Sequence, residues 1–212
     1  MSDVPLASAR QPHGVVQPVS KFIYSAYQDL LAVGHGRNEP AVTALISAFH
    51  PNKDCPMQTL AELFEHTLKD VYYAENAIAK AMPKVAKVVK NADLKKAVEH
   101  HLEETKSQIK TLDKVFKTIG VKPEGVKCDA TDGLIKEAEG LIEEGKGVAL
   151  DAGMLAACQA VEHYEIARYG SLREWAKVIG NEEAHVLLSE ILDQEKAANS
   201  KLTNLAVTAI NK

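Results

Sequence analysis

The chain has 212 residues and a formal net charge of −4, and its basic residues are scattered among acidic ones instead of forming a stripe, which argues against nucleic-acid binding. No run of about 18 apolar residues and no N-terminal secretory pattern is found, and the three cysteines are widely and irregularly spaced. We therefore expect a cytoplasmic protein that neither spans a membrane nor depends on disulfides.

Residues 1–56 differ in composition from the rest of the chain. They hold six of the eight prolines, and their helical patterns, around 22–33 and 41–49, are short. Because prolines at this density interrupt helices, we predict an N-terminal extension over 1–56, loosely helical or partly disordered, and a separate domain over 57–212. Three histidines of the extension lack ligand spacing and are interpreted as solvated side chains: His13, His35 and His50.

The sequence pattern in the first part of the domain predicts two long helices. Apolar residues recur at steps of three and four over 57–90, where Thr59 and Glu62 resemble a capping box and Pro83 predicts a kink or a break. A short polar turn then leads to a second helix over 93–119, ended by a glycine. Short connections of this kind make antiparallel neighbours.

The second part of the domain begins with a connector over 120–147 that contains a short helix around 134–142. A connector of this length can cross a bundle, so that the third helix, over 147–179, runs parallel to the second. A fourth helix follows over 182–210. The expected fold class is all-α: a ferritin-like antiparallel four-helix bundle with one long crossover containing a short helix.

Each long helix carries charged or imidazole side chains on its otherwise apolar seam. Unpaired carboxylates in a core cost several kcal/mol each, so buried acids need cations, hydrogen-bond partners or protons. Residues at equal distance from a shared turn lie side by side in antiparallel hairpins, which predicts that these side chains meet at one depth. They are Glu75 on the first helix, His101 and Glu104 on the second, Glu162 and Glu165 on the third, and Glu195 on the fourth.

A group of carboxylates with one imidazole suits Fe or Mn, and less selectively Zn. Carboxylates three residues apart, such as Glu162 and Glu165, can serve one centre from a single helix face. The pattern therefore predicts a carboxylate-bridged dinuclear Fe or Mn site. The alternative is a metal-free hydrogen-bonded network in which Tyr72, Tyr169 and Gln108 take part.

Several residues near the acids receive other interpretations. Asp151 lies near the bundle end, where a structural hydrogen bond is expected. Tyr72 and Tyr169 lie within a turn of the acids and are expected to hydrogen-bond them. Cys158 is interpreted as a small buried hydrophobic residue. Three histidines off the seams are interpreted as surface or interface residues: His100, His163 and His185.

Over residues 57–212 the sequence resembles the YciF-like stress-response branch of the ferritin-like superfamily. The matching blocks read DVYYAE at 70–75, HLEET at 101–105, EHYEIA at 162–167 and LDQEK at 192–196. The resemblance implies a ferritin-like bundle, often a dimer, with a dimetal centre like that of rubrerythrin-type proteins. Ferritin-like di-iron sites usually carry Glu-x-x-His on two helices. Here the second helix reads His101-x-x-Glu104, and Ala198 stands three residues after Glu195, where a histidine would be expected, so fewer nitrogen ligands are expected.

The leading hypothesis is a cytoplasmic, stress-associated homodimer that holds two Fe or Mn ions. If the protein is an enzyme, it would be an oxidoreductase acting on oxygen or peroxide. The alternatives are non-catalytic metal binding, and a structural or interaction protein whose buried acids form a hydrogen-bonded network.

Overall fold

The computed structural model describes residues 57–211, in which no strand occurs, and the all-α prediction is confirmed for this part of the chain. The extension predicted over 1–56, with its helical patterns and solvated histidines, lies outside the described residues. The helices are α3 (Leu60–Val88), α4 (Ala92–Thr118), α5 (Asp129–Glu144), α6 (Gly147–Val178) and α7 (Glu182–Leu205), followed by the π-helical turn η1 (Ala206–Ile210).

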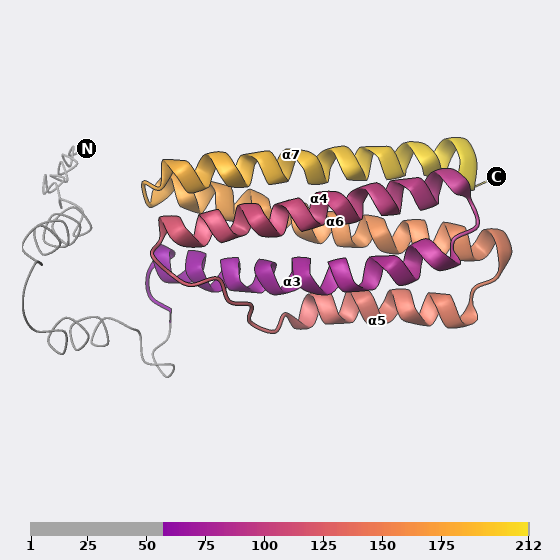
Figure 1. The fold of residues 1–212 in the computed structure, drawn as a ribbon, viewed down its shortest axis with the longest axis horizontal. Helices are drawn as coiled ribbons and strands as arrows, with labels where there is room; N and C mark the ends of the chain where they lie inside the picture. The colour runs from indigo at the N-terminus through magenta and orange to yellow at the C-terminus, as the bar shows by residue number, and fades with distance from the viewer. Residues whose placement is uncertain (1–56, 212) are drawn as a thin grey trace, which may run out of the picture. The chain divides into compact units, whose positions relative to one another are not determined.

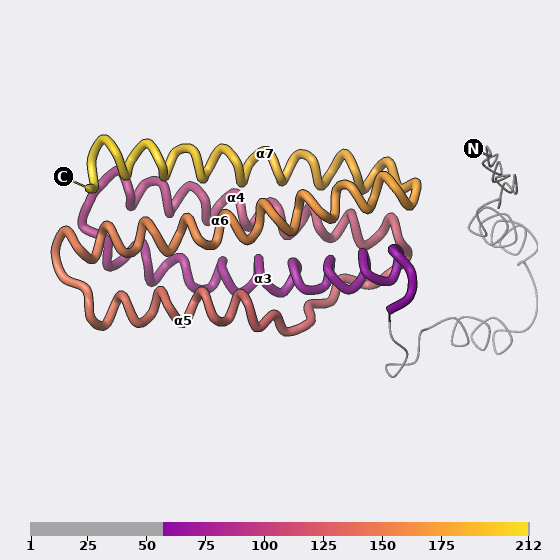
Figure 2. The backbone as a smooth tube through the Cα atoms, turned by 180° about the vertical axis from the view of Figure 1, so that it is seen from behind, coloured from indigo at the N-terminus to yellow at the C-terminus, as the bar shows by residue number. Residues whose placement is uncertain are grey.

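The four long helices form an antiparallel bundle. Around it, α3 packs against α4 and α6, and α7 packs against the same two helices. The chain runs in one direction along α3 and α7 and in the opposite direction along α4 and α6, so every helix is antiparallel to its neighbours (Figures 1 and 2). The crossover through α5, which lies outside the bundle along α3 and α6, makes α6 parallel to α4, as predicted.

The predicted start of α3 is confirmed. The Thr59 hydroxyl accepts a hydrogen bond from the Glu62 backbone N–H at 3.2 Å, and the Glu62 carboxylate accepts one from the Thr59 N–H at 2.8 Å. Helix α3 continues through Pro83, so a break there was wrong, although its last turns bend toward α4 (Figure 1). Met82 and Val85 are buried beside Pro83, and their packing holds the helix together across the missing N–H donor.

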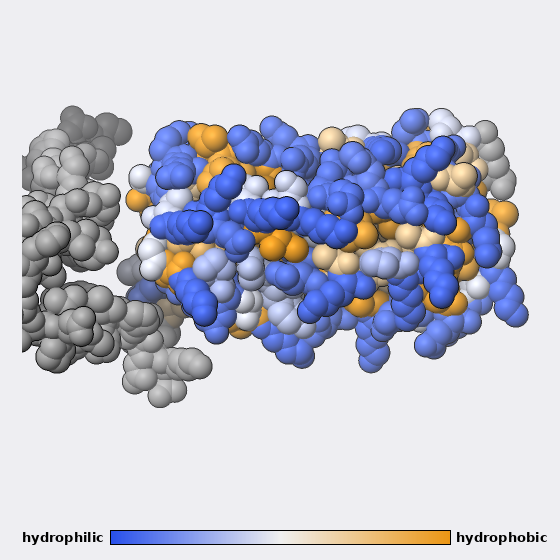
Figure 3. Space-filling model, in the orientation of Figure 1, coloured by the Kyte–Doolittle hydropathy of each residue, from blue (hydrophilic) through white to orange (hydrophobic). Residues whose placement is uncertain are grey.

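The apolar core is divided into two clusters. One cluster, which includes Leu94 and Met154, lies toward the α3–α4 turn, and the other, which includes Phe64 and Phe116, lies toward the α6–α7 turn. The sequence positions between the two clusters on each helix carry the buried glutamate and histidine side chains. The face of the bundle seen in Figure 3 is largely hydrophilic, with hydrophobic side chains showing in patches. None of the helices in residues 57–211 has the length and apolar character that a membrane span requires.

Asp151 fixes the turn between α3 and α4, as predicted. Its carboxylate is buried and accepts hydrogen bonds from the backbone N–H groups of Lys90 at 2.7 Å and Asn91 at 2.8 Å. The Asn91 side chain in turn accepts from the N–H groups of Asp93 and Leu94, each at 3.0 Å, and caps α4. One acid from α6 therefore joins that helix to the α3–α4 turn.

We expect the substitution Asp151→Asn to lower the free energy of unfolding by about 1–3 kcal/mol, because the amide can accept at only one atom and leaves a backbone N–H unpaired. Urea denaturation measures the change. Asp193→Asn is the control: this side chain is 79% exposed, and its substitution should change stability by no more than about 0.5 kcal/mol. Equal effects of the two substitutions would contradict the role assigned to Asp151.

Candidate metal centre

Five ionisable side chains are buried between the two apolar clusters, and they come from all four long helices. Their residues are at most 8% exposed: Glu75 on α3, His101 on α4, Glu162 and Glu165 on α6, and Glu195 on α7. Each lies at a seam position that apolar side chains occupy on either side, which is why the helix period brings it inward. The sequence pattern therefore located this layer.

Four of these side chains converge on one point. His101, Glu162, Glu165 and Glu195 each offer a ligand atom, and the four atoms all lie within 4.8 Å of one another. His101 Nε2 lies 3.2 Å from Glu162 Oε1 and 3.9 Å from Glu195 Oε2. Three carboxylates and an imidazole at such distances can surround a single cation.

Glu75 borders this group of four. The Tyr169 hydroxyl donates a hydrogen bond to Glu75 Oε1, while Glu75 Oε2 is buried without a partner in the described residues. Burial and the neighbouring charge of Glu195 raise the pKa of Glu75 to about 8. Glu75 thus places a further carboxylate oxygen beside the convergent atoms.

Glu104 lies at the outer edge of the cluster. Its side chain is 27% exposed, with one oxygen 3.6 Å from His101 Nδ1 and the other 3.4 Å from His100 Nε2. This position orients the His101 ring and leaves its Nε2 directed at Glu162. The structure therefore brings five of the six predicted ligands into the buried layer and places Glu104 beside it.

The buried carboxyl groups favour their protonated forms. Burial raises the pKa of Glu162 to about 7 and that of Glu195 to about 9, and it raises the pKa of Glu165 well above its ordinary value. Burial alone would lower the pKa of His101, but the surrounding carboxylates reverse this effect and raise it. The cluster thus binds protons at neutral pH unless another positive charge replaces them.

Many polar atoms of the layer have no hydrogen-bond partner among residues 57–211. They include five carboxylate oxygens, namely Oε2 of Glu75, Glu162 and Glu195 and both oxygens of Glu165, together with both ring nitrogens of His101. Unpaired buried groups of this kind are costly and rare in folded proteins. Unpartnered oxygens beside a single imidazole nitrogen fit a hard or borderline divalent cation better than one that prefers sulfur.

Two side chains donate hydrogen bonds to the carboxylates. The Gln108 amide donates to Glu195 Oε1 at 2.5 Å, and Tyr169 donates to Glu75, as expected for Tyr169. The same expectation for Tyr72 was wrong, because its hydroxyl donates to Asp113 on α4 at 3.1 Å. Tyr169 and Gln108 therefore fix the orientation of two acids from outside the convergent group.

Two cavities adjoin the buried acids, and the sequence analysis missed both. The larger, of about 170 Å³, lies between α3, α5 and α6 and reaches His101 and Glu162. The smaller, of about 50 Å³, reaches the same two side chains and is also lined by Glu104 and Lys201. No sequence signal identifies such spaces, because most of their walls are ordinary apolar residues that read as core. Cys158, interpreted as a buried hydrophobic residue, is half-buried and lines both cavities.

Comparison with known proteins identifies close relatives. Protein YciF of Escherichia coli (strain K12) is 43% identical over 158 residues, which cover 74% of this chain and 95% of YciF. The crystal structure of the E. coli stress protein YciF matches with a TM-score of 0.71 over 74% of this chain and 99% of that one. The structure of YcfI from Rhodopseudomonas palustris is 50% identical, with a TM-score of 0.69 over 71% of this chain and 96% of that one.

A family model covers nearly all of the described residues. It matches residues 59–212 and is described as "Domain of unknown function (DUF892)". The matched segment contains the whole helical bundle and every residue of the buried acidic layer. On this match and on its identity with YciF, the chain belongs to the DUF892 family, as a YciF-like protein.

Proposed function

We propose that this protein binds two divalent cations, Fe or Mn, in the buried acidic layer and takes part in the stress response. The observation that carries the proposal is the convergence of His101, Glu162, Glu165 and Glu195, whose ligand atoms lie within 4.8 Å of one another. The E. coli relative is named as a stress protein, and this is the basis for the link to stress. The cytoplasmic location and the homodimer stay predictions from the sequence.

The charge of the layer favours two cations over one. Four buried carboxylates, when ionised, carry four negative charges, which two divalent cations balance. The convergent group would hold the first ion, and Glu75 would hold the second together with carboxylates that bridge from the group. In this arrangement Glu104 keeps His101 in place, and the ligand role predicted for Glu104 itself stays a prediction.

Bound Fe or Mn would supply electron transfer to oxygen or peroxide. The chain's own residues would contribute binding and orientation. Tyr169 and Gln108 hold Glu75 and Glu195, and the apolar clusters at both ends keep bulk water away from the acids. Repeated consumption of hydrogen peroxide by the metal-loaded protein would indicate catalysis, whereas a single equivalent would indicate storage.

A metal-free structural role is the second candidate function. Gln108 and Tyr169 already donate hydrogen bonds into the layer, as a purely hydrogen-bonded network would require. In addition, the R. palustris relative is named as a candidate structural protein. Against this role stand the five carboxylate oxygens without partners, which such a network should have satisfied.

Metal content distinguishes the two candidates. Protein purified without chelators is expected to hold about two Fe or Mn per chain by mass spectrometry. The double substitution Glu162→Gln, Glu195→Gln should abolish this content, because neutral amides are poor replacements for bridging carboxylates. Glu190→Gln, at an exposed position of the same helix as Glu195, is the control and should keep it. Metal-free wild-type protein whose melting temperature is unchanged by added Fe or Mn would contradict the proposal.

The Tyr169 hydroxyl is expected to support metal binding through Glu75. Tyr169→Phe removes the hydrogen bond that orients this carboxylate and should weaken metal affinity about 10- to 100-fold. Tyr72→Phe, which removes a hydroxyl bonded to Asp113 instead, should leave the affinity unchanged. After a chelator has removed bound metal, titration with Mn²⁺ measures the metal affinity of both variants. Equal affinities of the two variants would show that the Tyr169 hydrogen bond has no part in metal binding.

The stability of the metal-free protein is expected to fall as the pH rises. Glu162, Glu75 and Glu195 have folded-state pKa values of about 7, 8 and 9, above the ordinary value of 4.5, so the folded state holds their protons more tightly than the unfolded state. The contribution of these three protonated groups to the free energy of unfolding is fully present below about pH 4.5. It is lost as the pH rises through their folded-state pKa values.

Melting temperatures of chelated protein between pH 5 and pH 9 test this expectation. Metal should offset the loss increasingly toward high pH, because it binds the deprotonated carboxylates. The Glu162→Gln, Glu195→Gln variant should show a weaker pH dependence. A melting temperature of the chelated wild type that is flat or rises across this range would refute the assignment.

A further inference from the structure

We propose that the 170 Å³ cavity between α3, α5 and α6 is a binding site for a small, uncharged, mainly apolar molecule of about the size of benzene. The bound molecule would lie with its inner end beside His101 and Glu162. This site needs no metal for binding, and it stands apart from the ligand set described above, which it meets only at those two residues.

The walls of the cavity select for an apolar body. Between its two ends the cavity is lined by apolar side chains from three helices, among them Ile78, Met82, Leu134, Ile142, Met154 and Val161. Such walls offer ordered water too few of the polar partners that it needs. An engineered apolar cavity of about 150 Å³ stays dry and binds benzene or xenon, which sets the scale for a space of this size.

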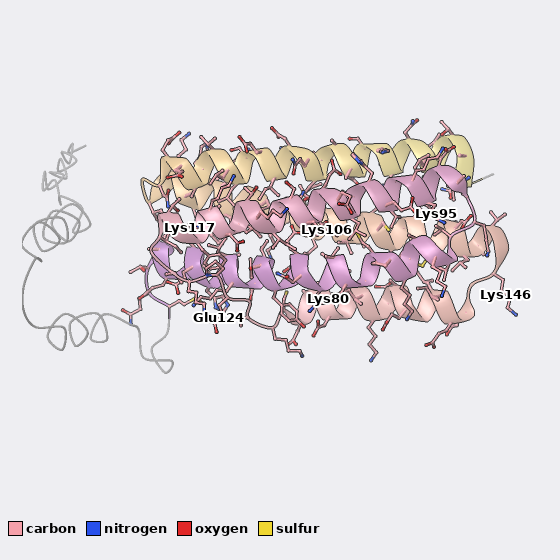
Figure 4. The ribbon with its side chains drawn as sticks, in the orientation of Figure 1. Lys80, Lys95, Lys106, Lys117, Glu124 and Lys146 are labelled. Carbon is pink, nitrogen blue, oxygen red and sulfur yellow. The ribbon has the colours of Figure 1, made fainter. Side chains whose placement is uncertain are left out.

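The cavity has an outer end at the surface and an inner end at the acids. Lys84 and Glu139 form an ion pair of 3.0 Å between α3 and α5, and both side chains are about half exposed. Lys80, on the stretch of α3 that runs beside α5, also lines this end (Figure 4). At the inner end Glu162 is 2% exposed, and its Oε2 has no hydrogen-bond partner in the described residues.

These two ends exclude charged occupants. An anion would bring its charge toward Glu162 and the carboxylates behind it, and the lysines at the outer end are too exposed to compensate for its burial. A cationic group lying between the two ends would be surrounded by apolar side chains and would lose its hydration without a partner of opposite charge there. An uncharged molecule meets neither penalty.

Helix α5 covers the cavity without being part of the bundle core. Thr131 is the only residue of α5 that is fully buried, and Leu134, Ala138 and Ile142 are half-buried where they line the cavity. The start of α5 is held by two polar contacts, from Tyr73 OH to Asp132 at 2.8 Å and between Cys128 Sγ and Tyr164 OH at 2.9 Å. At its other end α5 is joined to α6 through residues 145 and 146, and the ion pair ties it to α3 near its middle. Because only one of its residues is fully buried, α5 is the wall of the cavity that opens at the lowest cost.

The test uses the full chain after removal of metal, with benzene and toluene as probes and isothermal titration as the readout. Two substitutions fill the cavity from opposite sides: Ala157→Leu on α6 and Ala138→Leu on α5. Ala156→Leu is the control, because this neighbouring residue of α6 is exposed and does not line the cavity. Melting curves establish that each variant is folded.

We expect the wild type and Ala156→Leu to bind both probes with equal affinity, and the two filling substitutions each to weaken binding at least about tenfold. Benzoate should also bind at least about tenfold more weakly than benzene. The proposal is overturned if the wild type binds neither probe. It is also overturned if the two cavity-filling variants, once shown to be folded, bind the probes as tightly as the control. Metal content is measured on the same variants and should be unchanged in Ala157→Leu, so that failure of the metal site and failure of the cavity are distinguishable.

Discussion

The removal of ionisable side chains from water at one level of the bundle is the constraint on which the rest of the structure depends. Fully burying a Leu or Phe side chain contributes about 1.5–3 kcal/mol, whereas burying an unpaired carboxylate costs several. The layer of Glu75, Glu162, Glu165 and Glu195 therefore needs apolar packing at both ends, and the two clusters supply it. Proton uptake neutralises the charge of the layer and so offsets the cost of this burial, and the proposed cations would do the same.

The orientation of the side chains in the buried layer is set by residues outside it. Tyr169 and Gln108 donate to the acids from their own helices, and Glu104 faces the outer nitrogen of His101. Asp151, at the end of the bundle, joins α6 to the α3–α4 turn and so fixes the level at which Glu162 meets His101. An arrangement held by its neighbours in this way keeps the carboxylates and the imidazole in place, as the proposed cation site would require.

The sequence was sufficient to predict the helices, the inward acids and the role of Asp151, because each follows from a period of 3.6 residues and from distances to a turn. Tyr72 shows the limit of this reasoning. The period places it within a turn of Glu75, but only the packing of α3 on α4 shows that Asp113 is nearer. The cavity was beyond prediction for a related reason: it is space that apolar side chains fail to fill, and their shapes together decide it.

Helix α5 lies outside the four helices that hold the buried acids. The four long helices carry the clusters and the acids, so substitutions in them change the free energy of unfolding and the centre together. Helix α5 adds mostly half-buried side chains along the outside of α3 and α6, three of which border one cluster (Ala138, Leu141 and Ile142), and it carries none of the buried acids. Substitutions in α5 would therefore change the walls of the proposed binding cavity beside His101 and Glu162, while the four helices that hold the acids keep their sequence.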